Sequence, residues 1–180
     1  MATKISYLPL LLCTVLSASS NAAVPTADSK NQTDLTAVFS GIEKDCGGSN
    51  PSLQNAMGWL STRTGKPPLV DKAPGGFRAA IGGGTVAVKN GGDAWTLFVS
   101  TPNASYRGAK LFGVERVSGN NNGISSLSLI FAEGPAVVTK ALGKIKVPKA
   151  DPDAIVEPVV PQLFTEKGTS RAVLMCDFST

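Results

Sequence analysis

Two stretches of alternating apolar and polar residues, each interrupted by a turn rich in glycine and asparagine, constrain the fold of this chain more than any other feature. The first covers residues 85–100 around the turn at 90–93, Asn-Gly-Gly-Asp. The second covers residues 110–132 around the turn at 119–123. An Asn-Gly turn between alternating runs is typical of a β-hairpin. Because the connection between the two hairpins is short, we expect their strands to form one antiparallel meander.

Apolar residues at helical spacing predict two helices before these hairpins. The first is expected over residues 34–46, with Asp34 as its N-cap and a glycine pair at its end. The second is expected over residues 51–63, because Ser49 or Asn50 caps it and a proline occupies its first turn.

The remainder of the chain adds one helix and one strand. Gly-Pro opens a helix over residues 135–142, and alternation predicts a strand over 171–178. The four prolines within residues 146–168 predict an irregular segment. The order of elements predicts a single α+β domain over residues 34–180. Its antiparallel sheet combines a meander of about four strands with a C-terminal strand, and the N-terminal helices and the later helix pack on one face.

The N-terminus has the pattern of a secretory signal peptide. Lys4 precedes an apolar run at residues 7–16, and small residues follow it. We expect a signal peptide over residues 1–22, with cleavage after Ala18 or Ala23 as alternatives, and a flexible leader over 23–33. Since the apolar run has about half the length that a bilayer requires, no transmembrane anchor is expected after cleavage. The predicted location is the periplasm or the extracellular medium.

Two of the three cysteines lie beyond the predicted signal, at positions 46 and 176. Cys46 continues the apolar stripe of the first helix, and Cys176 alternates with Leu174 and Phe178 on the predicted last strand. Both sulfurs are therefore expected in one core. In an oxidising compartment such a pair predicts a disulfide, and two separate buried thiols are the alternative.

The chain contains no histidine, which excludes Ser-His-Asp and Cys-His catalysis and histidine zinc ligands. The net charge of +4 is modest, and no arginine-rich run with interleaved aromatics favours nucleic-acid binding. The glycine run within residues 75–84 lacks the lysine and hydroxyl residue of a phosphate loop. No Ser-x-x-Lys stands at a predicted helix start, so no serine nucleophile is assigned.

Acidic residues are candidates for paired catalytic carboxylates and for metal ligands. Glu115 and Glu133 lie on opposite arms of the second hairpin, where the predicted register separates them by about 10 Å in most arrangements. The acids at 151, 153 and 157 lack the spacing of a calcium-binding loop. No catalytic residue, metal ligand or cofactor is therefore predicted.

Two groups of residues are candidates for a partner surface. One group is basic and surrounds the end of the third helix, and the other is apolar and lies among the prolines that follow. They are Lys140, Lys144, Lys146 and Lys149, and Ile155, Val156, Val159 and Phe164. Cations in a cluster attract anionic partners, whereas a solubilising surface is the alternative for the lysines. Packing onto the domain is the alternative for the apolar group.

These observations favour an exported, non-enzymatic protein, of the kind represented by inhibitors and immunity proteins, that binds a macromolecular partner such as a protein or an envelope polysaccharide. An envelope hydrolase with an unrecognised serine or carboxylate site is one alternative. A structural component of the cell envelope is another.

Overall fold

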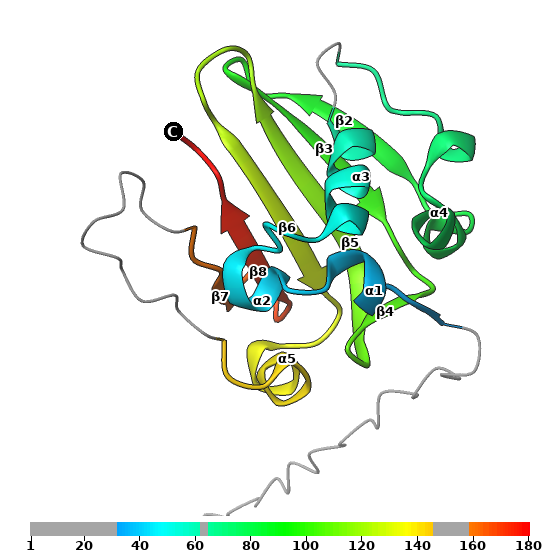
Figure 1. Ribbon diagram of the computed structural model, residues 1–180, viewed down its shortest axis with the longest axis vertical. Helices are drawn as coiled ribbons and strands as arrows, with labels where there is room; N and C mark the ends of the chain where they lie inside the picture. The colour runs from blue at the N-terminus through cyan, green and yellow to red at the C-terminus, as the bar shows by residue number, and fades with distance from the viewer. Residues whose placement is uncertain (1–31, 62–64, 146–158) are drawn as a thin grey trace, which may run out of the picture.

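The computed structural model describes residues 32–61, 65–145 and 159–180. Within them the chain forms an α+β structure around a mostly antiparallel, mixed sheet of eight strands (Figure 1). The predicted α+β class is confirmed. The strands are β1 (Thr33–Asp34), β2 (Val86–Asn90), β3 (Ala94–Ser100), β4 (Ala104–Tyr106), β5 (Ala109–Gly119), β6 (Ser125–Phe131), β7 (Gln162–Thr165) and β8 (Ala172–Asp177).

The sheet is organised around β5, the longest strand. Along most of its length β5 pairs with β3 on one side and β6 on the other, and β2, β8 and β7 extend the sheet outward. Near its start β5 pairs instead with β4, which β1 joins in parallel. A bulge between Leu111 and Gly113 separates the two regions of β5. Both predicted hairpins are present, as the antiparallel pairs β2–β3 and β5–β6.

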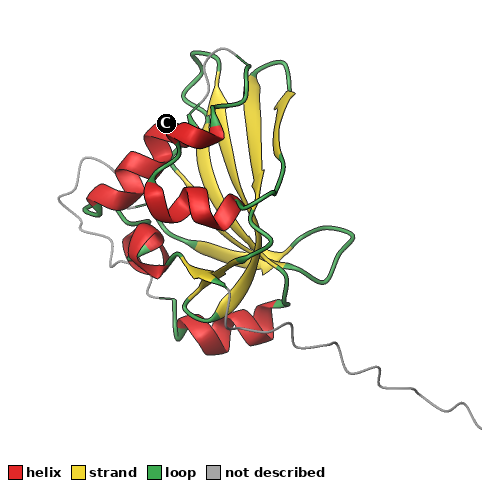
Figure 2. Ribbon diagram, turned by 90° about the vertical axis from the view of Figure 1, so that its right-hand side faces the viewer, coloured by secondary structure: helices red, strands yellow, loops and turns green. Residues whose placement is uncertain are grey.

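The helices lie mainly on one side of this sheet, and the opposite face carries none within the described residues (Figure 2). They are α1 (Thr36–Phe39), α2 (Ile42–Asp45), α3 (Pro51–Leu60), the 3₁₀ turn η2 (Val70–Lys72), α4 (Gly75–Ile81) and α5 (Pro135–Leu142). The core between helices and sheet contains fully buried side chains from both layers, including Phe39, Leu53, Leu97, Leu129 and Leu174.

The prediction of one helix over residues 34–46 is wrong. The chain forms two short helices, because Ser40 adopts an extended ψ of 130° and Gly41 a left-handed φ of 91°. Glycine reaches that φ without a steric cost. The chain changes direction at this break, and Phe39 of α1 and Ile42 of α2 are both buried in the core.

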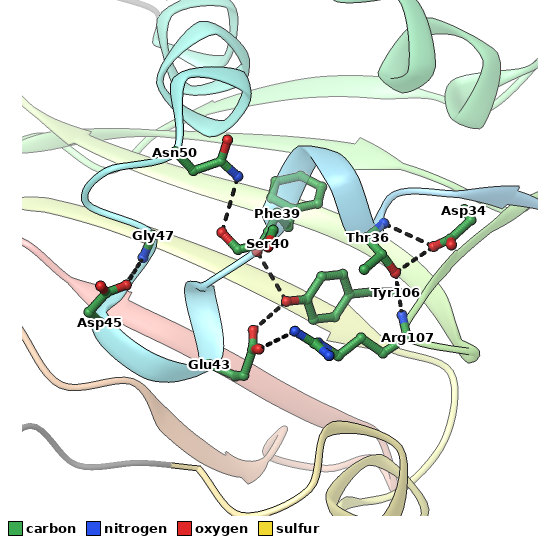
Figure 3. A network of polar contacts seen from close by, with 10 residues as sticks. All are labelled: Asp34, Thr36, Phe39, Ser40, Glu43, Asp45, Gly47, Asn50, Tyr106 and Arg107. Carbon is green, nitrogen blue, oxygen red and sulfur yellow. Dashed lines mark hydrogen bonds and ion pairs between the residues drawn. The ribbon is translucent and has the colours of Figure 1, made fainter.

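Helix α3 begins where its cap predicts. The Asn50 side chain accepts a hydrogen bond from the Ser52 amide at 2.9 Å, and Pro51 occupies the first turn. The side-chain amide of Asn50 also donates to the carbonyl of Ser40 at 3.1 Å (Figure 3). It donates to the carbonyl of Val38 at the same distance. One side chain therefore caps α3 and attaches it to the end of α1.

The predicted disulfide is confirmed. Cys46 and Cys176 are joined by an S–S bond of 2.05 Å, with their Cα atoms 5.7 Å apart, and both residues are buried. Cys46 directly follows α2, and Cys176 lies on the core-facing side of β8 beside Leu127 of β6. The bridge ties the N-terminal helices to the last strand.

Three short strands and one helix were not predicted. β7 lies in a segment expected to be irregular, of which residues 146–158 fall outside the described part. β1 begins at Thr33, at the end of the expected flexible leader, because the Thr33 amide donates to the Asn103 carbonyl at 2.7 Å. β4 occupies the expected connection between the hairpins, and α4 is seven residues long. Pairing with distant partners, rather than local pattern, determines these strands.

Candidate functional site

A polar network surrounds the buried carboxylate of Glu43 on α2 (Figure 3). Arg107 forms an ion pair with it at 2.6 Å, and the hydroxyl of Tyr106 donates a hydrogen bond to its other oxygen. That hydroxyl also lies 3.1 Å from the Phe39 carbonyl. Burial, and then the hydrogen bond to Glu43, raise the pKa of Tyr106 well above its ordinary value. Tyr106 therefore stays protonated at neutral pH and acts as a donor.

A second part of the network continues toward the N-terminus of the described chain. Asp34 accepts hydrogen bonds from the amide and the hydroxyl of Thr36, at 2.9 and 2.6 Å. The same hydroxyl accepts from the Arg107 amide at 2.9 Å (Figure 3). The network thus fastens α1 and α2 to the turn between β4 and β5. Glu43 and Tyr106 are buried, and both carboxylate oxygens of Glu43 have partners within the chain.

The structure does not bring Glu115 and Glu133 together. Glu115 on β5 lies opposite Ser128 of β6, and Glu133 follows five positions further along, beyond the end of that strand. Burial, and to a lesser degree the charge of Glu166, raise the pKa of Glu115. Glu166 is paired with Arg171 at 3.4 Å.

Aromatic rings accompany these charges on the sheet face that no described helix covers. Phe98 lies opposite Glu115 in the β3–β5 pair, and its ring centre is 5.7 Å from that of Phe112. The guanidinium of Arg171 lies 3.5 Å from the centre of the Phe112 ring. Phe164, opposite Val173 in the β7–β8 pair, is 41% exposed. We call the set Phe98, Phe112, Glu115, Phe164, Glu166 and Arg171 the open-face cluster. Sequence reasoning missed it, because its members come from four separate segments.

A loop at the edge of the molecule presents the most exposed large apolar side chain among the described residues. Leu69 is 66% exposed and its neighbour Val70 is also exposed. Two prolines precede them. The indole nitrogen of Trp59 on α3 donates to the Leu69 carbonyl at 3.0 Å. We call residues 67–73 the Leu69 loop.

A second hydrogen bond holds the far end of the Leu69 loop. Arg78 on α4 donates to the carbonyl of Asp71 at 3.3 Å. The ring of Trp59 meets that of buried Phe77 edge-on, with centroids 5.4 Å apart. Both hydrogen-bonding side chains therefore come from helices, α3 and α4, and Leu69 between them is exposed to solvent.

Half of the sequence-predicted partner surface lies within the described residues. Lys140 is exposed on α5 and Lys144 is exposed just beyond it. Val159 is half-buried and packs against the core. Phe164 belongs to the open-face cluster. The remaining four residues, Lys146, Lys149, Ile155 and Val156, lie outside the described part, as do the acids at 151, 153 and 157.

The glycine run after α4 allows the backbone there to pass close to the backbone at the end of β3. A side chain at Gly84 would place its Cβ 2.4 Å from the Ser100 carbonyl oxygen and 2.7 Å from that of Ile81.

Across the described ranges no group of three or more acidic or cysteine side chains is placed to hold a metal ion. Nor does any helix in those ranges have the length and apolar character needed to cross a bilayer.

No protein-family model, curated protein sequence or solved structure significantly matches the chain.

Proposed function

We propose that this protein is an exported, non-enzymatic binding domain, of the inhibitor or immunity type, that recognises a protein partner through the Leu69 loop. The observation that carries the proposal is the exposure of Leu69 on a loop whose carbonyls are held by Trp59 and Arg78. Contiguous exposed apolar surface marks interaction sites on soluble domains, and Leu69 and Val70 are adjacent exposed apolar residues. The proposal therefore assigns Leu69 as the anchor residue of an interface.

The energetics of association support this assignment. Burying a leucine side chain in a partner's pocket contributes about 1.5–3 kcal/mol. A loop that is already ordered loses little conformational entropy on binding, so more of that gain appears as affinity. The two prolines before Leu69 restrict the backbone further. The partner that fits is a protein with an apolar pocket wide enough for a leucine side chain.

The disulfide supports the proposed location. Bonds between cysteines persist in oxidising compartments and are rare in the cytosol. The pair Cys46–Cys176 therefore agrees with the export that the N-terminal signal pattern predicts.

Affinity capture with matched variants tests the proposal. Wild-type protein is immobilised beside Leu69→Asp and Val137→Asp, the latter changing an apolar residue of α5 that is 53% exposed. Exposure to an envelope extract of the source cells should yield one partner, in 1:1 stoichiometry after purification, for wild type and Val137→Asp and not for Leu69→Asp. Equal capture by all three would contradict the proposal. Sedimentation with cell wall alone would favour a structural envelope component.

The carboxylates of the open-face cluster favour a second candidate, an envelope hydrolase. Glu115 has a raised pKa whereas Glu166 is paired with Arg171, and two acids in contrasting environments are typical of acid–base catalysis. Panels of glycoside, ester and peptide substrates test this candidate. Turnover that Glu115→Gln abolishes would establish the hydrolase and refute the non-enzymatic proposal.

A further inference from the structure

Arg116 of β5 is a buried cation with few partners. The residue is 8% exposed and lies opposite Leu97 and Leu127, on the sheet face that carries the helices. One Nη atom donates to the Ser126 carbonyl at 2.8 Å, and the other donates to the Ser125 hydroxyl at 2.7 Å. The Nε–H is buried and has no acceptor. Since a guanidinium has five N–H donors, most of its donor capacity is unused.

No carboxylate neutralises this charge in the part of the chain that the structure describes. The ion pairs found there involve Arg107, Arg171 and Lys72. The ring of Phe178 lies beside the guanidinium, 5.8 Å from its carbon, and supplies only a weak cation–π contact. Burial lowers the pKa of Arg116. An unpaired buried charge destabilises a fold, so this arrangement indicates a ligand of opposite charge.

A hollow of about 410 Å³ lies at the turn between β5 and β6. Its lining consists of Gly119, Asn120, Asn121, Gly123, Ile124 and Ser125. Ser125 therefore belongs both to the wall of the hollow and to the hydrogen-bonding shell of Arg116.

Two hydrogen bonds attach the turn that forms this hollow to the rest of the sheet. The side-chain amides of Asn120 and Asn122 donate to the carbonyls of Gly92 and Asp93, both at 2.9 Å, and connect the turn to the neighbouring hairpin. The hollow has the volume of a small-ligand site, and its six lining residues are uncharged.

We propose that this hollow binds a carboxylate group, and that Arg116 is the counter-ion of that group. A guanidinium matches the two oxygens of a carboxylate. One cation among neutral walls balances a single negative charge, which favours a carboxylate over a doubly charged phosphate. The carboxylate takes the place of the Ser125 hydroxyl as acceptor, and the free Nε–H supplies a second bond. The site is independent of the Leu69 loop.

Titration followed by amide NMR tests the proposal. The probes are sodium acetate, a blocked Gly-Glu-Gly peptide, and sodium chloride and sodium phosphate at matched ionic strength. We expect saturable shifts of the 119–125 amides with acetate or the peptide. Tighter binding of the peptide would assign the carboxylate to a protein side chain, whereas tighter binding of acetate would assign it to a small organic acid.

Two variants connect the response to Arg116. Arg116→Met should weaken carboxylate binding at least tenfold while its melting temperature stays equal or rises, because an apolar residue of similar size replaces an unpaired charge. Lys89→Met, which removes an exposed cation from β2, should bind as wild type does. The proposal is overturned if wild type shows no saturable carboxylate response, if phosphate alone gives one, or if Arg116→Met responds like wild type. The wild-type titration decides the matter even if Arg116→Met fails to fold.

Discussion

Removal of the disulfide should cost this domain a large part of its stability. The bridge joins residues separated by 130 positions. In the chain-entropy model, a loop of that size restricts the unfolded state by about 5 kcal/mol, which is an upper figure. Domains of ordinary size have a free energy of unfolding of about 5–15 kcal/mol. We therefore expect Cys46→Ala/Cys176→Ala to lose up to about 5 kcal/mol of its free energy of unfolding, and its melting temperature to fall by up to roughly 20 °C.

Equilibrium unfolding in guanidinium chloride measures this loss. The variant is compared with wild type in its oxidised form and after reduction, and all three are fitted with the linear extrapolation. Reduced wild type should resemble the variant, which separates the effect of the bridge from that of the lost sulfur atoms. A difference below about 1 kcal/mol would refute the entropic reasoning. Two titratable thiols in unreduced, unfolded wild type would refute the bridge itself.

Three further substitutions test the local arguments. Asn50→Ala removes both the cap of α3 and its link to α1, so chemical denaturation should show a loss of about 1–2 kcal/mol. Glu115→Gln should raise the melting temperature at pH 7 and leave it unchanged at pH 4. The reason is that the stability of the wild type falls as pH rises through the elevated pKa of Glu115. An equal change in melting temperature at the two pH values would contradict this reasoning. Gly113→Ala should lower the melting temperature, because its Cβ would lie 2.5 Å from the Phe98 ring; an unchanged melt would show that the ring moves aside.

Features encoded within a few neighbouring residues could be read from the sequence. Asn50 and Pro51 mark the start of α3 because capping is a local interaction. The hairpins follow from turns between alternating runs. The disulfide was predicted from apolar patterns that place Cys46 and Cys176 in one core, and both are buried there although the helix expected to carry Cys46 is two short helices.

Features that depend on distant partners could not be read in this way. Glu43 meets Tyr106, 63 positions away, and nothing near either residue indicates the pairing. β7 is a strand because β8 pairs with it, although the prolines before it favour a loop. The break between α1 and α2 at Gly41 could not be predicted either, because a glycine within a helical pattern is often tolerated. Arg116 and the open-face cluster emerge only when the register of the sheet is known.

Site-specific photo-crosslinking tests the central claim of partner recognition most directly. A benzophenone amino acid is placed at position 69 in one variant and at the exposed position 137 in another, and each is illuminated with the envelope fraction of the producing cells. We predict one dominant crosslinked protein from position 69, absent from position 137 and displaced by excess unlabelled wild type. Identical crosslinking patterns from the two positions, or a pattern that unlabelled protein does not displace, would contradict recognition through the Leu69 loop.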